Sequence, residues 1–270
     1  MKFEYTQEIK SLQYDYYHKY YKDTLNLPDY EDRIENRFFE EVNDAKFLKN
    51  ILGELKITDI DTKKILIIGL GTGSVLKHLV EMGCKDIYGI EPNEDALKIC
   101  HLKGSILQID ISKLTNHFAE NMPFNDSSFD FIFSRSVFEH VQDLEKSFSE
   151  TIRVLKSGGI SYTNCPNYNY PLEDHFKIPA FTFFGRTVTK IFSILFRGKA
   201  EFIDSLQFTT PYKIDRILKK SKNIFYYRIY RSYSEAKTSS LKENIKVLFY
   251  KFFQKELNMV KTQEIVVVKK

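Results

Sequence analysis

The chain lacks the cysteine patterns that mark metal-binding, redox-active or disulfide-stabilised proteins. Its three cysteines, Cys84, Cys100 and Cys165, lie too far apart for a C-x-x-C motif. The N-terminal sequence MKFEYTQEIK also lacks the apolar core of a signal peptide. We therefore expect a cytoplasmic protein whose cysteines are small apolar packing residues.

The chain also lacks an uninterrupted apolar run that could cross a bilayer. Its most apolar segment, residues 176–196, contains Lys177, Arg186 and Lys190, whereas a spanning helix needs about 20 mostly apolar residues. Such a mixture is typical of a cap over a site or of a helix at a membrane interface. There is no internal repeat or low-complexity tract, and a chain of 270 residues with 43% hydrophobic content can bury a substantial core.

The charge of the chain is small overall but unevenly divided. The net charge is +4, yet residues 1–170 carry 20 basic and 27 acidic side chains, whereas residues 171–270 carry 20 and 9. A basic surface on the later part would attract a phosphate-bearing substrate, an anionic membrane or nucleic acid. A solvated basic surface without any partner explains the pattern equally well.

The strongest motif is a glycine-rich turn between a buried strand and a helix, KKILIIGLGTGSVLKHL at residues 63–79. Such a turn presents backbone N–H groups with no side chains in the way, so it can hold a nucleotide-like ligand. Gly69, Gly71 and Gly73 read G-x-G-x-G, whereas a dinucleotide fingerprint reads G-x-G-x-x-G. The spacing therefore favours a ligand without a pyrophosphate.

An acidic residue ends the next apolar run, twenty residues beyond Gly71. The run DIYGIEPN places Glu91 at the tip of the second strand, where a carboxylate can accept hydrogen bonds from both hydroxyls of a ribose. Together with the glycine turn, it predicts an adenosine pocket.

These residues, followed by the sequence MPFNDSSFDFIFSRSVFEHVQDLEKSFSETIRVLKSGG, resemble the class I S-adenosylmethionine-dependent methyltransferases. The resemblance covers roughly residues 65–166 and lies in the branch near the ubiquinone and menaquinone methyltransferases. No single tripeptide is specific. The ordered set is specific: glycine turn, acidic strand end, PF-x-x-x-x-FD before an apolar strand, and RVL-K-x-GG before the next strand.

The alternation of apolar strands and amphipathic helices predicts an α/β fold. The resemblance implies a Rossmann-like seven-stranded sheet, mostly parallel with an antiparallel last strand, with helices on both faces and a helical cap. We expect an N-terminal helical lead-in at residues 1–56, with two helices broken around Pro28, and a methyltransferase domain at 57–270 with a cap insertion at about 167–210. The first expected strand begins at residue 65 and runs into the glycine turn, and a helix follows that turn. The other expected strands are 87–91, 106–109, 129–134, 160–164, 225–232 and 264–269, and the other expected helices are 95–103, 144–155, 212–221 and 241–255.

The resemblance implies S-adenosyl-L-methionine as the cofactor. Gly69, Gly71 and Gly73 would pass its methionine part, and Glu91 would hold the ribose. The carboxyl ends of parallel strands share one rim of the sheet, which would bring Ser134 to the same ligand. In the family an acidic residue contacts adenine with the next backbone N–H, which Asp110 and Ile111 would supply, although twelve residues separate them from the PF motif. A helix N-cap is the alternative for Asp110.

Three residues are candidates for the chemistry at the acceptor. His140 lies in the loop SRSVFEH after the fourth strand, and Asp174 and His175 follow the fifth strand in PLEDHF. An imidazole with an ordinary pKa near 6.5 can act as a general base, although packing near the cofactor would also explain His140. Glu173, Asp174 and His175 resemble an acidic-histidine cluster to which a divalent cation has been linked in the ubiquinone-type enzymes, but adjacent residues cannot all reach one ion from regular structure. We expect no metal ligands.

The function expected from the resemblance is O-methylation of a small molecule or glycan, such as a polysaccharide, a lipid-linked sugar or a quinone precursor. A catalytically inactive binding protein and an N-methyltransferase remain the alternatives. Peripheral membrane contact through residues 176–197 is a further hypothesis. Nucleic acid is a poor candidate, because no N-P-P-[FY] motif and no RNA-binding module is present.

Overall fold

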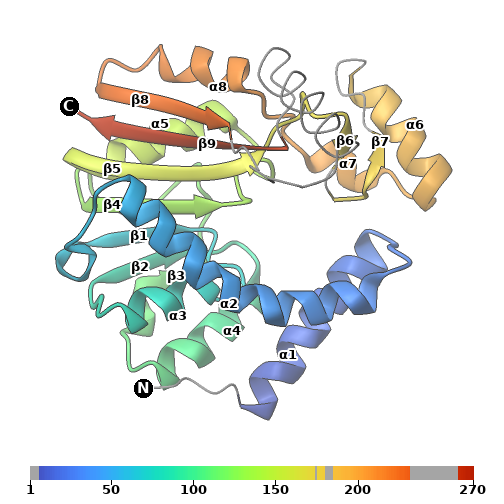
Figure 1. Cartoon of the computed structure of the whole chain (residues 1–270), viewed down its shortest axis with the longest axis horizontal. Coiled ribbons are helices and arrows are strands. Elements are labelled where there is room, and N and C mark those ends of the chain that lie inside the picture. The colour runs from blue at the N-terminus through green and yellow to red at the C-terminus, as the bar shows by residue number, and fades with distance from the viewer. Residues whose placement is uncertain (1–5, 174, 180–184, 232–260) are drawn as a thin grey trace, which may run out of the picture.

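The structure, a computed structural model, describes residues 6–173, 175–179, 185–231 and 261–270. Seven strands form one sheet in the order β3-β2-β1-β4-β5-β9-β8, and two short strands, β6 and β7, form a ribbon beside it (Figure 1). The main strands are β1 Ile65–Ile68, β2 Ile87–Ile90, β3 Leu114–Thr115, β4 Phe129–Arg135, β5 Leu155–Pro166, β8 Ile224–Arg231 and β9 Thr262–Lys269, and the ribbon is β6 Leu172–Glu173 with β7 Ile178–Pro179.

The sheet is parallel except at β9. β1 pairs in parallel with both β2 and β4, whereas β9 runs antiparallel to its neighbours β5 and β8. The strand order reverses direction between β1 and β4, and ligands of open α/β sheets bind at the carboxyl ends of strands at such a point. This is the predicted Rossmann-like sheet with its antiparallel last strand, and the fold prediction is confirmed.

Helices cover both faces of the sheet because its strands are apolar on both sides. α2, α3 and α4 cover one face, where Ile65 and Ile67 of β1 are buried, and α5 and α8 cover the other, where Leu66 and Ile68 are buried. The helices are α1 Gln7–His18, the π-helix η1 Lys19–Thr24, α2 Tyr30–Glu54, η2 Ile60–Thr62, α3 Ser74–Glu81, α4 Glu94–Ile106, η3 Ile111–Lys113, α5 Leu144–Val154, α6 Arg186–Arg197, α7 Glu201–Ser205 and α8 Pro211–Leu218.

A third hydrophobic cluster joins the N-terminal helices to the segment that follows β5. Tyr21 and Leu25 from η1 and its end pack with Phe176, Ile203 and Leu206. The helical lead-in and the cap therefore share one core, although about 150 residues separate them in the sequence. The break between the lead-in helices falls around Pro28, as the sequence predicts.

Two family motifs that are far apart in sequence lie in contact in the structure. The Arg153 guanidinium, in the RVL motif, donates to the backbone carbonyl oxygens of Phe124 and Met122 in the PF motif at 2.7 and 3.1 Å. Glu150 completes the link by accepting from the Met122 N–H at 2.9 Å. This motif pair is a structural clamp between α5 and the loop before β4.

Two sequence expectations differ from the structure or fall outside it. The strand predicted at 106–109 is wrong, because α4 continues to Ile106 and β3 begins only at Leu114. Gly104 of α4 allows Ile111 to pack closely against this helix, since a Cβ at Gly104 would lie 2.9 Å from Ile111 Cγ2. The helix predicted at 241–255 lies outside the described residues. Within the described part of the chain, no helix combines the length and apolarity that a membrane span requires.

Candidate functional site

The glycine turn between β1 and α3 adopts a backbone that favours glycine at all three positions. Gly69, Gly71 and Gly73 have φ angles of +77°, +53° and +84°. A Cβ on Gly69 would lie 2.2 Å from Val137 Cγ2, whereas a Cβ on Gly71 would meet no atom within 4 Å. The turn is therefore packed against the loop after β4 at Gly69 and open at Gly71, where a ligand has room.

Glu91, at the end of β2, faces this opening. Its carboxylate accepts from the Gly71 N–H at 2.8 Å and from the Asn93 N–H at 3.0 Å. Burial raises the pKa of Glu91, and these two hydrogen bonds act in the opposite direction. The structure thus brings Gly71 and Glu91 into contact, as the twenty-residue spacing predicts.

Ser134 lies at the same rim, because its partner in the sheet is Ile68, the residue before Gly69. The side chain is fully buried. In the described part of the chain its hydroxyl oxygen has no hydrogen-bond partner. A buried hydroxyl without a partner is costly unless a ligand or water satisfies it, so Ser134 fits a ligand on the glycine turn.

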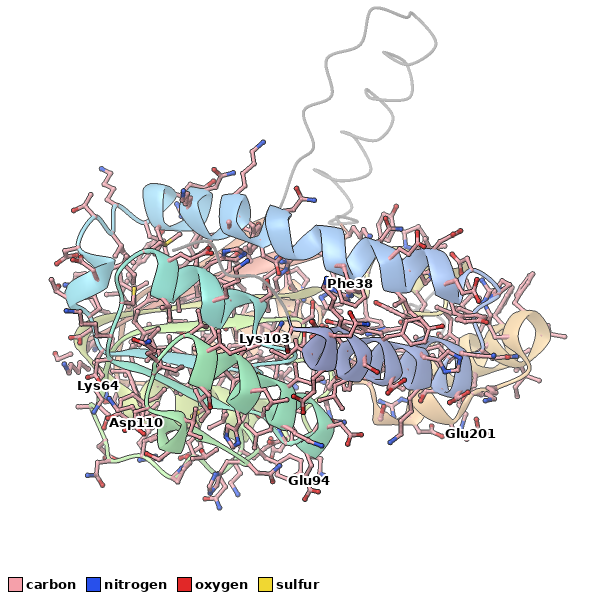
Figure 2. All side chains as sticks on the ribbon, turned by 90° about the horizontal axis from the view of Figure 1, so that it is seen from below. Phe38, Lys64, Glu94, Lys103, Asp110 and Glu201 are labelled. Atoms are coloured by element: carbon pink, nitrogen blue, oxygen red, sulfur yellow. The ribbon has the colours of Figure 1, made fainter. Side chains whose placement is uncertain are left out.

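Asp110 and Ile111 lie elsewhere, so the structure does not bring these two predicted residues to the site. Asp110 is exposed and caps η3 by accepting from the Ser112 N–H at 3.0 Å and from the Ser112 hydroxyl at 2.6 Å. Figure 2 shows Asp110 at the end of the molecule where Lys64 enters β1, away from Glu94 at the start of α4. The N-cap alternative is correct. The physical reason is that β3 lies downstream of Asp110 instead of ending at it.

The residues that follow the true β3 were missed. Asn116 donates to the backbone carbonyl oxygens of Glu91 and Pro92 at 3.3 and 3.0 Å, so the loop after β3 lies against the end of β2. Two residues later Phe118 is 53% exposed. The unusually long segment between the predicted β3 and the PF motif could have revealed the error, because this segment is short once β3 lies at Leu114–Thr115.

Helix α1 covers the glycine turn, which the sequence did not predict. Gln13 and Tyr17 both bond the Thr72 hydroxyl, at 3.3 and 2.9 Å. Burial first and the Glu91 charge second raise the pKa of the Tyr16 phenol well above its ordinary value. Figure 2 shows α1 beside α4 and α2. Gln13 and Tyr17 thus hold α1 against the glycine turn.

A second cluster of polar side chains lies between the loop after β4 and the cap. In that loop Val137 packs against Gly69 and Phe138 is buried in the core, which fixes the following Glu139 and His140. The His140 ring lies 5.1 Å from the His175 ring, centroid to centroid. One ligand-type atom each from Glu139, His140 and His175 lies within 4.8 Å of the others. The structure thus unites two of the three predicted catalytic residues.

Glu173 and Phe202 complete this acceptor cluster, by which we mean Glu139, His140, Glu173, His175 and Phe202. The buried Glu173 carboxylate lies 2.5 Å from His175 Nδ1 and accepts from the Phe176 N–H at 2.6 Å. The Phe202 ring contacts both imidazoles, at 5.7 and 5.2 Å between centroids. Glu139 and Phe202 are additions to the predicted set of site residues, whereas Glu173 belongs to the acidic-histidine cluster named from the sequence. Asp174 lies outside the described residues.

Electrostatics keep the His140 imidazole neutral. Burial, with a smaller contribution from the neighbouring His175, lowers the pKa of His140 to about 3. A neutral imidazole can accept a proton or bind a cation. The cluster therefore offers an unprotonated imidazole beside a buried carboxylate, in the same loop whose Val137 contacts the glycine turn.

Comparison with known proteins supports this reading of the strand ends. Residues 66–163 match a family model described as "Methyltransferase domain". An uncharacterized protein of Mycobacterium tuberculosis is 34% identical over 106 residues, 38% of this chain and 36% of that protein. The ubiquinone biosynthesis O-methyltransferase of Rhizobium rhizogenes is 29% identical over 101 residues, 37% of this chain and 39% of the relative. The matches thus span little more than a third of either relative's length.

Among solved structures, a Thermotoga maritima S-adenosylmethionine-dependent methyltransferase, described as a possible histamine N-methyltransferase, superposes with a TM-score of 0.54. The superposition covers 94% of this chain and 99% of the other, at 18% identity. This likeness shows a shared fold and extends it to the lead-in and cap.

Proposed function

Because residues 66–163 form a class I S-adenosylmethionine-dependent methyltransferase domain, we propose that the chain is an enzyme that transfers a methyl group from S-adenosyl-L-methionine to an oxygen of a small molecule or glycan. One observation carries the proposal: the Glu91 carboxylate and the open space at Gly71 lie together at the strand ends. This open space suits an adenosine-bearing ligand, and the loop after β4 connects it to the His140 and His175 imidazoles.

The cofactor would occupy the rim that α1 covers. Gly69, Gly71 and Gly73 would flank its methionine part, and the Glu91 carboxylate would accept from the ribose hydroxyls. The buried Ser134 hydroxyl would gain its partner from the same ligand. Phe118 is our candidate for the adenine wall, since an exposed ring beyond β3 can stack on a base.

The acceptor would bind beside the acceptor cluster, in a chamber made by the lead-in and the cap. Methyl transfer is an in-line displacement, so the protein must align nucleophile, carbon and sulfur. Activation of an acceptor hydroxyl requires a group that takes its proton or lowers its pKa. The neutral His140 would take this proton. Relatives named for O-, N- and C-methylation share the domain, so transfer to nitrogen is the second candidate.

The test is cofactor binding followed by turnover. Calorimetry with S-adenosylmethionine alone shows whether the protein binds the cofactor. Mass spectrometry then screens sugars, lipid-linked sugars and quinols for a gain of one methylene. Tight cofactor binding together with no turnover on any class would favour the alternative, a methyltransferase-like binding protein.

A peripheral membrane contact through α6 is part of the same proposal. The buried positions of this helix are the polar Thr189 and Ser193, and Phe192 packs against the third hydrophobic cluster, whereas four other apolar side chains face outward. The exposed fractions are 50% for Ile191, 55% for Ile194, 73% for Leu195 and 54% for Phe196. An amphipathic helix whose apolar face points away from the protein is typical of a membrane interface.

Basic residues border this apolar face and favour anionic lipid. Lys190 is paired with the Asp204 carboxylate at 2.6 Å. Arg186 donates to the backbone carbonyl oxygen of Leu206 at 2.7 Å and lies over the Phe208 ring, and Arg197 donates to the backbone carbonyl oxygen of Phe176 at 2.9 Å. Co-sedimentation with vesicles tests this contact. We expect binding to phosphatidylglycerol vesicles but not to phosphatidylcholine vesicles, and loss of binding in Leu195→Glu. Phe225→Glu, a 76% exposed residue of β8, is the matched control. Equal sedimentation of both variants contradicts the contact.

A further inference from the structure

One carboxylate of the lead-in contacts both sides of the candidate cofactor site. Asp44 lies near the middle of α2, and its side chain is 17% exposed. Its Oδ2 atom accepts from the Ser74 hydroxyl at 2.7 Å, and its Oδ1 atom accepts from the Arg135 guanidinium. The matched family model covers residues 66–163, so Asp44 lies outside the part of the chain that the family describes.

Each partner of Asp44 is the direct neighbour of a residue that we place at the cofactor. Ser74 begins α3 and follows Gly73, whereas Arg135 ends β4 and follows Ser134. The Asp44 side chain therefore ties the glycine turn after β1 to the end of β4. In the proposed function these two segments flank the same ligand.

The strands β1 and β4 separate at this level of the sheet. Ile68 and Ser134 form the last pair of their register. Beyond that pair, the Gly69 N–H donates to a carbonyl oxygen of β2 at 2.9 Å, whereas the Ser136 N–H donates to a carbonyl oxygen of β5 at 2.8 Å. The two backbones thus turn toward opposite neighbours, and open α/β sheets bind ligands at such a divergence. Asp44 spans it.

The core of the protein supports this bridge. Leu48 and Ile51, on the same helix as Asp44, are buried against the sheet. The Arg135 guanidinium lies over the Phe47 ring, 4.5 Å from its centroid, so α2 supports both members of the ion pair. A charge-assisted hydrogen bond between partly buried groups is stronger, and less screened by salt, than one on the surface. The bridge is therefore suited to fix the spacing of the two segments.

We propose that Asp44 is a positioning residue for cofactor binding. By tying the start of α3 to the end of β4, it sets the distance between the open space at Gly71 and the Ser134 hydroxyl, so that one S-adenosyl-L-methionine molecule can engage both. Asp44 itself needs no contact with the cofactor. A pocket whose walls are already in place loses less binding free energy to reorganisation than one that must be drawn together. The inference deepens the proposed function and rests on it for the identity of the ligand.

Calorimetry with S-adenosylmethionine and with adenosine tests this role, because only the larger ligand would reach from Glu91 to Ser134. We expect Asp44→Ala to raise the Kd for S-adenosylmethionine about 10-fold, the effect of one lost charge-assisted hydrogen bond, and to change the Kd for adenosine by less than about twofold. Ser74→Ala/Arg135→Gln should match Asp44→Ala. Adding Asp44→Ala to that double variant should cause no further loss, because the three residues act as one unit. Asp44→Asn, which can accept from Ser74 but carries no charge for Arg135, should fall between.

Asp130→Ala is the matched control, because the Asp130 carboxylate also joins two segments, by accepting from the Lys64 N–H and from Lys156 Nζ at 2.9 Å each, but at the amino ends of the strands. It should bind both ligands like the wild type, and circular dichroism melts establish that each variant is folded at the assay temperature. The proposal is overturned if Asp44→Ala binds S-adenosylmethionine as the wild type does. It is also overturned if Asp44→Ala weakens adenosine binding equally, which would indicate a local folding defect. A wild-type protein that binds neither ligand would contradict the proposed function, and this inference with it.

Discussion

The two halves of the candidate site are built in different ways. The cofactor half consists of turns that directly follow β1, β2 and β4, so Gly71, Glu91 and Ser134 each lie beside a strand end. The acceptor half combines the loop after β4 with His175, Phe202 and the lead-in helix, because the Tyr20 ring contacts Phe202 at 6.0 Å. Residues at individual strand ends specify one half, whereas only the assembled tertiary structure specifies the other.

This difference predicts that the two halves can be disabled independently. Changes at the strand ends should remove cofactor affinity, and changes in the acceptor cluster should lower turnover at unchanged cofactor affinity. A change that lowered cofactor affinity and turnover equally would contradict this independence and would indicate a folding defect.

The largest effect is expected for Gly71→Val. The open space at Gly71 would be filled by a branched side chain, and φ at +53° adds strain of about 1–3 kcal/mol for a β-branched residue. We expect cofactor affinity to fall more than about 100-fold, measured by calorimetry. Gly71→Ala, with the same left-handed backbone but less bulk, should retain more affinity, and near-normal binding by Gly71→Val would show that the ligand lies elsewhere.

The second effect concerns the other half of the site. His140→Ala should lower kcat by about 100-fold or more, since loss of a positioned proton acceptor typically costs that much. The cofactor Kd should stay within about twofold in calorimetry. A parallel rise in Kd would show that the loop after β4 serves the cofactor as well.

The sequence predicted the contact between the glycine turn and Glu91 because its determinants are local, and the role of these residues in cofactor binding stays a prediction. Glycines in the left-handed region and a carboxylate at the next strand tip are fixed by turn geometry, so their spacing sufficed for Gly69, Gly71, Gly73 and Glu91. The acceptor half could not be read in this way. Glu139 was not predicted although its neighbour His140 was, and no sequence motif marks Phe202. Their positions in the site come from packing between segments about 60 residues apart.

The wrong strand prediction at 106–109 has the opposite cause, because tertiary packing overrides a local sequence pattern there. Residues 106–109 have the apolar pattern of a short strand, but the side chain of Ile109 packs around Gly104 and the sheet face instead of pairing with β2. Leu114 and Thr115 pair with β2 in their place. A strand of two residues is too short for periodicity to reveal.

The third effect is the loss of the ribose acceptor in Glu91→Ala. Two hydroxyl groups would lose a charged partner, which costs roughly 1–3 kcal/mol, so cofactor affinity should fall about 10-fold in calorimetry. The carboxylate must be ionised to accept from both hydroxyls. Since burial raises the pKa of Glu91, affinity should be full above that raised pKa and should decline as the pH falls through it. Glu91→Gln should show a flat profile, and an unchanged slope in that variant would assign the titration to another group.

The smallest effect is expected at the adenine end of the cofactor. Phe118 lies just beyond β3 and is 53% exposed, so its ring is available for stacking, which is worth about 1 kcal/mol. Phe118→Ala should weaken S-adenosylmethionine binding about fivefold and leave kcat unchanged at saturating cofactor. Asp110→Ala is the matched control, because Asp110 caps η3 and lies near Lys64 (Figure 2). Weaker binding in Asp110→Ala with normal binding in Phe118→Ala would restore the sequence assignment and contradict the one that the structure supports.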